Sequence, residues 1–461
     1  MRIQADLTDD IVEGLHRIRQ QFKVPEGFPP AVLAAADEAA KRLPSAHVDR
    51  TAWPFVTLDP ASSTDLDQAF HIEMSGSDVL LHYAIADVAW FVDDGDALDT
   101  EAWQRGATQY LPDGKAGLYP PVLAEGAASL LPDGPRPAIV FHVRIDTDGQ
   151  SKLDGVERSL IRSTAKLAYE TVKPAQLPDS FPELARRIAH AEEVRGAARI
   201  EPLEQQVHAL DQGGYDISFQ PRLQSEDDNA AMSLATNLAI ADALYAAGTG
   251  LFRVMPEPDA RAEQRLRHTA RALGIEWAAD TNLRQFERSL DGTDAKSAAL
   301  LMAIRRAGGG ASYVPFTAGE RPWHSAMAAT YAHATAPLRR LADRYVVMAT
   351  LAIANGQPLP EHVAAAFPKL PDVMEKADST ASQIERAVID LAEVALLSAQ
   401  TQRTFSAVVT DVDDRGARIQ LCDLPVVSRV DAHHVAPGDD LRVRVVSADI
   451  PTRTAKFERV A

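Results

Sequence analysis

Three aspartates within nine positions are the feature that most limits how this chain can fold. Asp59, Asp65 and Asp67 follow the apolar run 55–58, inside the stretch TLDPASSTDLDQAF (residues 57–70). Carboxylates that folding brings together repel one another unless a cation or bound protons compensate. The loop therefore either holds a metal ion or is simply polar and faces water.

The composition of this loop narrows the choice of metal. An EF-hand loop that began at Asp65 or Asp59 would need glycine at its sixth position, where the chain has Phe70 or Thr64. Hard oxygen ligands without histidine or cysteine suit Mg²⁺, or Mn²⁺ in its place, rather than zinc. Since Mg²⁺ is usually held by a few carboxylates together with substrate phosphates, the loop is compatible with metal-assisted phosphate chemistry. A plain polar loop stays open as the alternative.

A second motif, YAHATAPLRRLADR, occupies residues 331–344. We expect Thr335 to cap a helix with Pro337 in its first turn, where unpaired backbone N–H groups attract anions. Arg339 would share a helix face with Asp343 and could pair with this aspartate, and Arg340 is the next residue after Arg339. A guanidinium group at a helix start is well shaped to bind phosphate. The alternative is an ordinary surface ion pair.

Length, charge and cysteine content set the broad class. A chain of 461 residues is too long for one core, so two to four domains are expected. The formal charge of −18 argues against broad nonspecific binding to nucleic acid, although residues 403–461 carry nine basic and nine acidic side chains. The single cysteine, Cys422, excludes an intrachain disulfide and favours a cytoplasmic setting. The acidic N-terminus and the short apolar run 345–354 predict neither export nor membrane insertion.

Hydrophobic periodicity predicts the order of elements. Two helices are expected over 8–23 and 29–43, as a docking arm on the main domain rather than a helix-turn-helix unit. Residues 53–150 indicate strands, including a hairpin around 75–78, with one short helix after residue 96. Residues 228–355 are predicted to be mostly helical, and 371–402 to form one long helix.

The last sixty residues change character. Five short β-rich runs separated by turns fit a small OB-type barrel. Arg442 and Arg444 alternate with Val443 and Val445, which predicts one charged and one buried strand face. For a single arginine a solvated face is the simpler interpretation, but for the whole barrel we favour nucleic-acid binding.

The two long motifs together resemble the signatures of the RNase II/RNase R family, which carries the RNB catalytic domain. The segments YAIADVAWFV, TQYLPDG and KLAYETV lie between them in the order that this family shows. The resemblance covers roughly residues 50 to 461. It implies an α+β protein, with a short helical N-terminal region (1–48), an RNB catalytic domain with a mixed sheet surrounded by helices (49–400), and a five-stranded OB-type RNA-binding barrel (401–461).

The resemblance also implies a function. We expect a monomeric 3′-to-5′ exoribonuclease that hydrolyses single-stranded RNA to nucleoside 5′-monophosphates with Mg²⁺. By motif, Asp67 matches the aspartate on which family catalysis depends most, and Arg339 the arginine that stabilises the scissile phosphate. The residues expected to act are Asp59, Asp65, Asp67 and Arg339 in catalysis, the same three aspartates as metal ligands, and Tyr110, Tyr169, Thr335 and Arg340 in RNA binding.

Three departures from the family pattern bear on activity. Gln68 stands where the family usually has a fourth aspartate, which predicts weaker or altered metal binding. Ala230 and Ala231 stand where an acidic residue is common. The N-terminal helical region is too short for cold-shock domains, so RNA capture is expected to rest on the catalytic channel and the last barrel. Two rival functions stay open. One is an RNB-fold protein that only binds single-stranded RNA. The other is a helix-turn-helix regulator, which residues 1–45 make less favoured because they lack a basic recognition helix.

Overall fold

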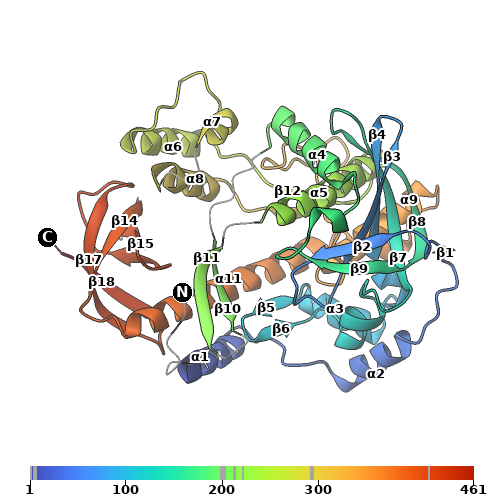
Figure 1. The fold of residues 1–461 in the computed structure, drawn as a ribbon, viewed down its shortest axis with the longest axis horizontal. Helices are drawn as coiled ribbons and strands as arrows, with labels where there is room; N and C mark the ends of the chain where they lie inside the picture. Colours follow the sequence, from blue (N-terminus) through green and yellow to red (C-terminus); the bar gives the residue numbers. More distant parts are fainter. Residues whose placement is uncertain are drawn as a thin grey trace.

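The computed structural model describes residue 3 and residues 8–197, 204–210, 214–220, 223–290, 295–413 and 416–460. A mixed seven-stranded sheet with helices around it lies at one end of the molecule, and a closed β-barrel lies at the other (Figure 1). A long helix, α11 (Leu370–Ser398), runs between the two. The predicted α+β architecture with a terminal barrel is therefore confirmed.

The large sheet has the order β1-β8-β7-β4-β3-β2-β9. Its centre is antiparallel, while β1 and β9 join in parallel. The predicted hairpin is present: Ser75 pairs with Asp78, and Gly76 takes the positive φ of +65° that a two-residue turn requires. The strands are β1 (Val48–Asp49), β2 (Phe55–Asp59), β3 (Gln68–Ser75), β4 (Asp78–Ala86), β7 (Arg136–Ile145), β8 (Ser151–Ile161) and β9 (Ser163–Ala168).

Helices pack on this sheet and close the first core. α5 (Gln224–Ala246) contacts β4, β7 and β8, and α4 and α9 pack against α5. Because α5 is enclosed in this way, its small and apolar residues are buried along most of its length. The other elements of this part are α2 (Pro30–Ala39), η2 (Val88–Trp90), α3 (Ala97–Arg105), β5 (Gln109–Leu111), β6 (Gly114–Ala116), η3 (Leu123–Ala127), η4 (Pro174–Gln176), α4 (Phe181–Arg195), β12 (Leu251–Val254), β13 (Ser312–Pro315), α9 (Leu341–Ala354) and α10 (Glu361–Ala366).

A small helical cluster, α6 (Ala260–Ala272), α7 (Leu283–Ser289) and α8 (Ala295–Ala307), has its own core. The Trp277 and Phe286 rings stack in it with centroids 4.1 Å apart. The region predicted to be mostly helical is thus helical up to Ala307, but it also contains the β12–β13 pair, and residues 316–340 form an irregular loop.

The second core joins the barrel to α11 and to α1 (Thr8–Gln21). α1 lies so close to α11 that a Cβ atom at Gly14 would come 2.6 Å from the Leu391 side chain. α2 packs on α3 instead, within the first core. The two N-terminal helices therefore dock on different cores and do not form one unit, because their apolar faces match different partners. The hairpin β10 (Glu204–Ala209) and β11 (Tyr215–Gln220) also packs on α11.

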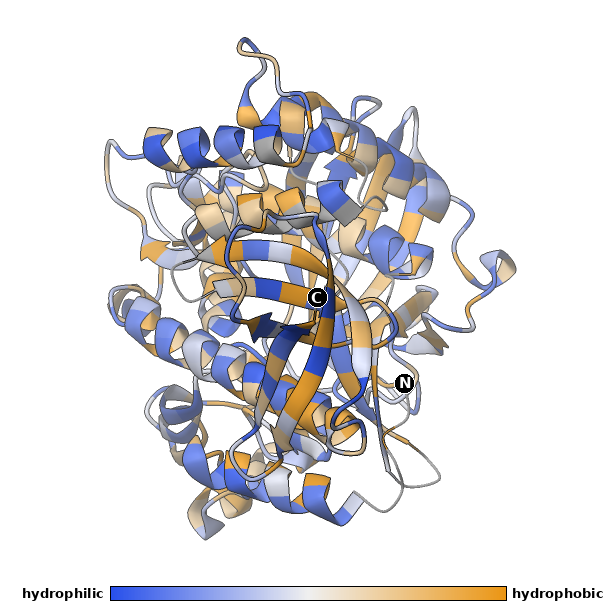
Figure 2. Ribbon diagram, turned by 90° about the vertical axis from the view of Figure 1, so that its left-hand side faces the viewer, coloured by the Kyte–Doolittle hydropathy of each residue, from blue (hydrophilic) through white to orange (hydrophobic). Residues whose placement is uncertain are grey.

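The barrel closes in the order β14-β15-β16-β18-β17, which confirms the five predicted strands. Apolar and polar residues alternate along its strands (Figure 2), and in β17 Val443 and Val445 are buried while Arg442 and Arg444 are exposed. The strands are β14 (Thr404–Asp413), β15 (Gly416–Leu421), β16 (Val427–Val430), β17 (Asp440–Asp449) and β18 (Thr454–Val460). In the part of the chain described, no helix combines the length and apolarity needed to cross a membrane.

Candidate active site

The acidic loop connects β2 to β3 and is held by backbone and hydroxyl groups. Asp59 is the last residue of β2, and Asp67 directly precedes β3. Ser129 fastens the loop between them, since its Oγ accepts from the Leu66 N–H at 2.9 Å and donates to the Thr64 carbonyl at 2.7 Å. The aspartates are thus presented by a fixed loop at a strand end rather than by a flexible one.

The second motif forms a loop and not the predicted helix. α9 begins only at Leu341, so Thr335 caps nothing. Asp343, which is fully buried, accepts from the Ala336 N–H at 2.9 Å and from Arg340 Nε and Nη2 at 2.9 and 2.7 Å. The predicted Arg339–Asp343 pair is therefore wrong. Arg339 lies outside the helix, so the four-residue spacing does not place it beside Asp343, whereas Arg340 reaches back to it.

The two motifs meet at Asp67. Its Oδ1 accepts from the Leu338 N–H at 2.7 Å, and its Oδ2 lies 3.4 Å from Arg339 Nε. Asp67 is only 4% exposed, while the Arg339 side chain is 45% exposed. The structure thus places a buried carboxylate beneath a guanidinium group that is open to solvent, from segments 271 residues apart.

The other two aspartates lie in different surroundings. Asp59 Oδ2 is buried and, among the described residues, has no hydrogen-bond partner. Asp65 Oδ1 pairs with Lys115 Nζ at 2.8 Å, and Asp65 Oδ2 lies 3.5 Å from the Tyr110 hydroxyl. Within the described residues, the three carboxylates do not gather their oxygens within 4.8 Å of one another. The expectation of one tight trio is therefore not met among these residues, and Asp65 pairs with Lys115 instead.

Burial dominates the electrostatics of the loop. It raises the pKa of Asp59 to about 7, against the opposing charge of Arg339, and the nearby Asp65 raises this pKa further. Burial likewise raises the pKa of Asp67 to about 7, against Arg339 and the Leu338 N–H. The buried Asp67 and the half-buried Asp59, whose Oδ2 has no hydrogen-bond partner among the described residues, are carboxylates whose charge a divalent cation would stabilise. Asp59 is the residue that fits a cation best.

Gln68 stands where the family usually has a fourth aspartate, and its side chain contacts the neighbouring strand of the sheet. Its Oε1 accepts a hydrogen bond from the Tyr83 hydroxyl on the neighbouring strand β4. Tyr83 is fully buried. The amide oxygen that could replace a carboxylate ligand is therefore engaged by a core tyrosine.

The two predicted tyrosines flank the acidic loop. Tyr110, in β5, is 55% exposed beside Asp65. Tyr169 follows β9, its N–H donates to the Asp59 carbonyl at 3.2 Å, and its hydroxyl accepts from Asn229 Nδ2 at 2.7 Å. Both rings therefore lie next to the aspartates, Tyr110 on the more open side.

Thr335 and Arg340 are occupied within the protein. Thr335 is 2% exposed and its hydroxyl bonds to Ser233 Oγ at 2.8 Å, and Arg340 forms the two-pronged pair with Asp343. Both side chains therefore brace the loop, and their contact with RNA stays a prediction. The sequence reasoning missed Lys115 and Asn229, although Lys115 directly follows the quoted segment TQYLPDG.

Comparison with known proteins shows two family models on this chain. The model of the RNB domain matches residues 47–355, and that of the RNase II-type exonuclease C-terminal S1 domain matches residues 403–460. The first covers more than half of the chain. The predicted boundaries at 48 and 400 remain predictions.

Individual relatives agree with the models. Ribonuclease R of Thermotoga maritima is 26% identical over 479 aligned positions, which cover 95% of this chain and 66% of that protein. The apo form of Mycoplasma genitalium RNase R superposes with a TM-score of 0.87 at 19% identity, over 98% of this chain and 78% of the other. Yeast Ssd1, described as a pseudonuclease, superposes with a TM-score of 0.71 at 16% identity, over 91% of this chain and 55% of the other.

Proposed function

This chain belongs to the RNB family, the family of RNase II and RNase R, and on that basis we propose that it is a hydrolytic exoribonuclease. It would remove nucleoside 5′-monophosphates from the 3′ end of single-stranded RNA. The observation that carries the proposal is the meeting of the two motifs at Asp67, beneath Arg339. A guanidinium group at this junction can stabilise the negative charge that develops on the phosphate oxygens as the phosphodiester bond breaks.

Each residue of the site has a proposed part. Arg339 presents its guanidinium group to the scissile phosphate. Asp67, held by the Leu338 N–H, fixes the orientation of this guanidinium group. Asp59, with Asp65 beside it, would hold Mg²⁺, which supplies charge neutralisation and an activated water. Tyr110 stacks on a terminal base, and Tyr169 flanks the reacting nucleotide.

The test is the substitution Asp67→Asn, assayed with a 5′-labelled single-stranded oligoribonucleotide. We expect stepwise shortening by the unaltered protein, monophosphate as the product on thin-layer chromatography, and loss of both in the variant. Asp372→Asn, an exposed aspartate in the first turn of α11, is the matched control and should retain activity. Unchanged shortening by the Asp67 variant would contradict the proposal.

Two observations favour a second candidate, an RNB-fold protein that binds RNA with weakened or lost catalysis. Gln68 is bonded to Tyr83, and the three aspartates do not form a compact trio among the described residues. Intact RNA in a retarded complex, with no monophosphate released in Mg²⁺ or Mn²⁺, would identify this function instead.

A further inference from the structure

Three histidines form a row across the large sheet, away from the aspartates. His71 on β3 lies directly opposite His82 on β4, and His82 lies directly opposite His142 on β7. Side chains alternate between the two faces of a strand, so these rings project from the face opposite to that of Gln68 and Tyr83. The row therefore belongs to a different surface of the sheet from the one that carries the Gln68–Tyr83 contact.

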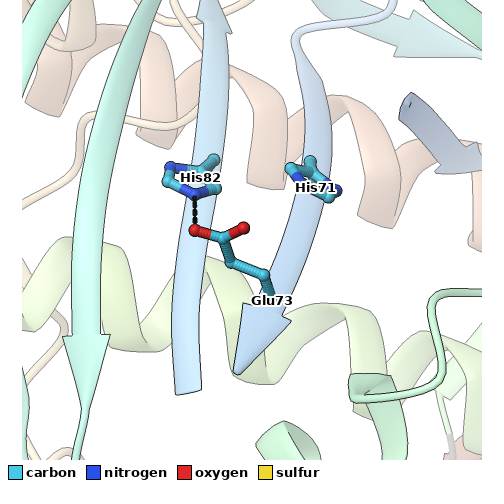
Figure 3. Close-up of side chains that lie close together, drawn as sticks. All are labelled: His71, Glu73 and His82. Atoms are coloured by element: carbon cyan, nitrogen blue, oxygen red, sulfur yellow. Dashed lines mark hydrogen bonds and ion pairs between the residues drawn. The ribbon is translucent and has the colours of Figure 1, made fainter. Parts of the chain in front are cut away.

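Glu73 completes a set of ligands with this row. It is two residues after His71 and so lies on the same face of β3. One ligand atom from each of His71, Glu73 and His82 lies within 4.8 Å of the others (Figure 3). Among the described residues, no other group of three or more His, Cys, Asp or Glu side chains is this compact. His82 Nε2 and Glu73 Oε1 are 3.3 Å apart, which is about the edge of a tetrahedron with bonds of about 2.0–2.1 Å.

The surroundings of His82 suit a metal ligand. Its Nδ1 lies 2.7 Å from His142 Nδ1, and His142 Nε2 lies 3.7 Å from Glu157. If the His82 Nδ1–H donates to His142, the His82 Nε2 lone pair is free to face Glu73, and the His142 Nε2–H faces a carboxylate. Histidines that bind metals usually have their second nitrogen fixed in this way.

Burial and access differ along the group. His82 is 4% exposed and packs against the Trp53 ring, with centroids 4.5 Å apart, whereas the Glu73 side chain is 53% exposed. An ion can thus reach the group from solvent on the Glu73 side and meet the buried His82 ring, whose position is fixed by its packing.

We propose that His71, Glu73 and His82 bind a divalent transition-metal ion of the Zn²⁺ type, at a site separate from the aspartate loop. Two imidazoles and one carboxylate are a donor set that zinc accepts and that Mg²⁺, which prefers all-oxygen ligands, does not favour. The ion would join β3 to β4 and so stabilise the central hairpin. The inference does not depend on the proposed RNA hydrolysis.

The test measures Zn²⁺ directly on the full-length protein. The chelator-stripped protein is dialysed against Zn²⁺, its bound zinc is determined by elemental analysis, and its melting temperature is recorded with and without the ion. We expect one bound ion and a higher melting temperature, with affinity reduced about tenfold or more in His71→Gln and in Glu73→Gln. Loss of the orienting partner in His142→Gln should weaken binding by about 10–100-fold.

Two controls separate this site from others. His433→Gln removes an exposed histidine from the barrel, and Asp67→Asn alters the aspartate loop. Both should bind Zn²⁺ as the unaltered protein does. Glu73 is exposed, so its substitution answers the question even if the His71 variant folds poorly, which far-UV circular dichroism would reveal. Unchanged zinc content in Glu73→Gln, or zinc that is lost with Asp67→Asn, would overturn the proposal.

Discussion

Asp67 shows how a single side chain can hold a site together. Its carboxylate is buried, yet it has a backbone donor on one oxygen and a guanidinium group near the other. The backbone N–H and the guanidinium group, both from the distant second motif, offset part of the cost of burying this carboxylate. In the part of the chain that the structure describes, these contacts leave most of the N–H donors of Arg339 available to a ligand.

Arg339 offers the sharpest prediction at this scale. Arg339→Lys keeps the positive charge but loses the planar fork, so we expect kcat to fall by about 10²–10³-fold with little change in KM. Steady-state hydrolysis of a labelled oligoribonucleotide measures both constants. Arg17→Lys, an exposed arginine of α1 paired with Glu13, serves as the control. A loss of less than threefold would remove Arg339 from the proposed chemistry.

Tyr110 is predicted to act through its ring and not through its hydroxyl. Tyr110→Ala should weaken RNA binding by roughly 1–3 kcal/mol, while Tyr110→Phe should bind almost as the unaltered protein does. Fluorescence anisotropy with single-stranded RNA, in the Asp67→Asn background to prevent cleavage, measures the dissociation constants. Equal weakening in both variants would instead assign the effect to the hydroxyl group beside Asp65.

Among the elements, the loop before α9 is the least expected. Thr335 and Pro337 are typical of a helix start, but the Ala334 and Ala336 N–H groups bond to the side chains of Asn237 and Asp343. These side chains supply acceptors from outside the loop, so the backbone has no need to form a helix. The loop therefore depends on two buried polar residues, one of them on α5.

Asp343→Asn tests that dependence. Removing this charge leaves Arg340, whose side chain is 26% exposed, without its counter-ion, so we expect the free energy of unfolding to fall by about 1–3 kcal/mol. Urea denaturation followed by circular dichroism measures the change. Asp372→Asn, an exposed aspartate also in the first turn of a helix, should leave stability almost unaltered. RNA hydrolysis should fall as well, because the loop carries Arg339.

The features that the sequence could predict are those that depend on interactions between residues close together in the chain. The β3–β4 hairpin, the long helix α11 and the five barrel strands arise from local periodicity and turn residues, and all three were predictable. The contact of Lys115 with Asp65 depends on side chains that the tertiary fold brings together. Arg340 pairs with Asp343 over three residues, but the choice of Arg340 over Arg339 depends on the non-helical segment before Leu341, which the buried side chain of Asn237 on α5 helps to hold. The motifs therefore predicted where the site lies but not how its charges pair.

At the scale of the whole molecule, α11 belongs to both large cores. Leu370 and Met374 pack in the first, and Ile384 and Leu391 pack in the second. Glu393, near the end of the helix, accepts from the Val427 N–H at 2.7 Å and from Gln205 Nε2 at 2.5 Å. This one carboxyl group therefore ties the helix to the barrel and to β10.

Glu393 predicts a pH dependence of stability. Burial raises its pKa to about 7, against the hydrogen bonds that it accepts, so the folded protein holds a proton that the unfolded chain releases near pH 4.5. Its contribution to stability is therefore present below about pH 4.5 and is lost as the pH rises to about 7. Glu393→Gln should match the unaltered protein near pH 4.5 and exceed its free energy of unfolding by about 1–3 kcal/mol at pH 8.

Denaturant titrations of both proteins at a series of pH values measure this difference. Glu375→Gln, an exposed glutamate of the same helix, should show no such dependence. A difference between the Glu393 variant and the unaltered protein that stays constant from pH 4.5 to 8 would contradict the assignment.

The length of α11 also sets a distance. An α-helix advances 1.5 Å per residue, so its 29 residues span about 43 Å. Its two ends are fastened in different cores, and the spacing between the barrel and the acidic loop therefore cannot vary freely (Figure 1). An RNA bound as proposed contacts both the barrel and the acidic loop only while it is long enough to span this distance. A fragment shortened below that length would contact one of the two and dissociate from the other.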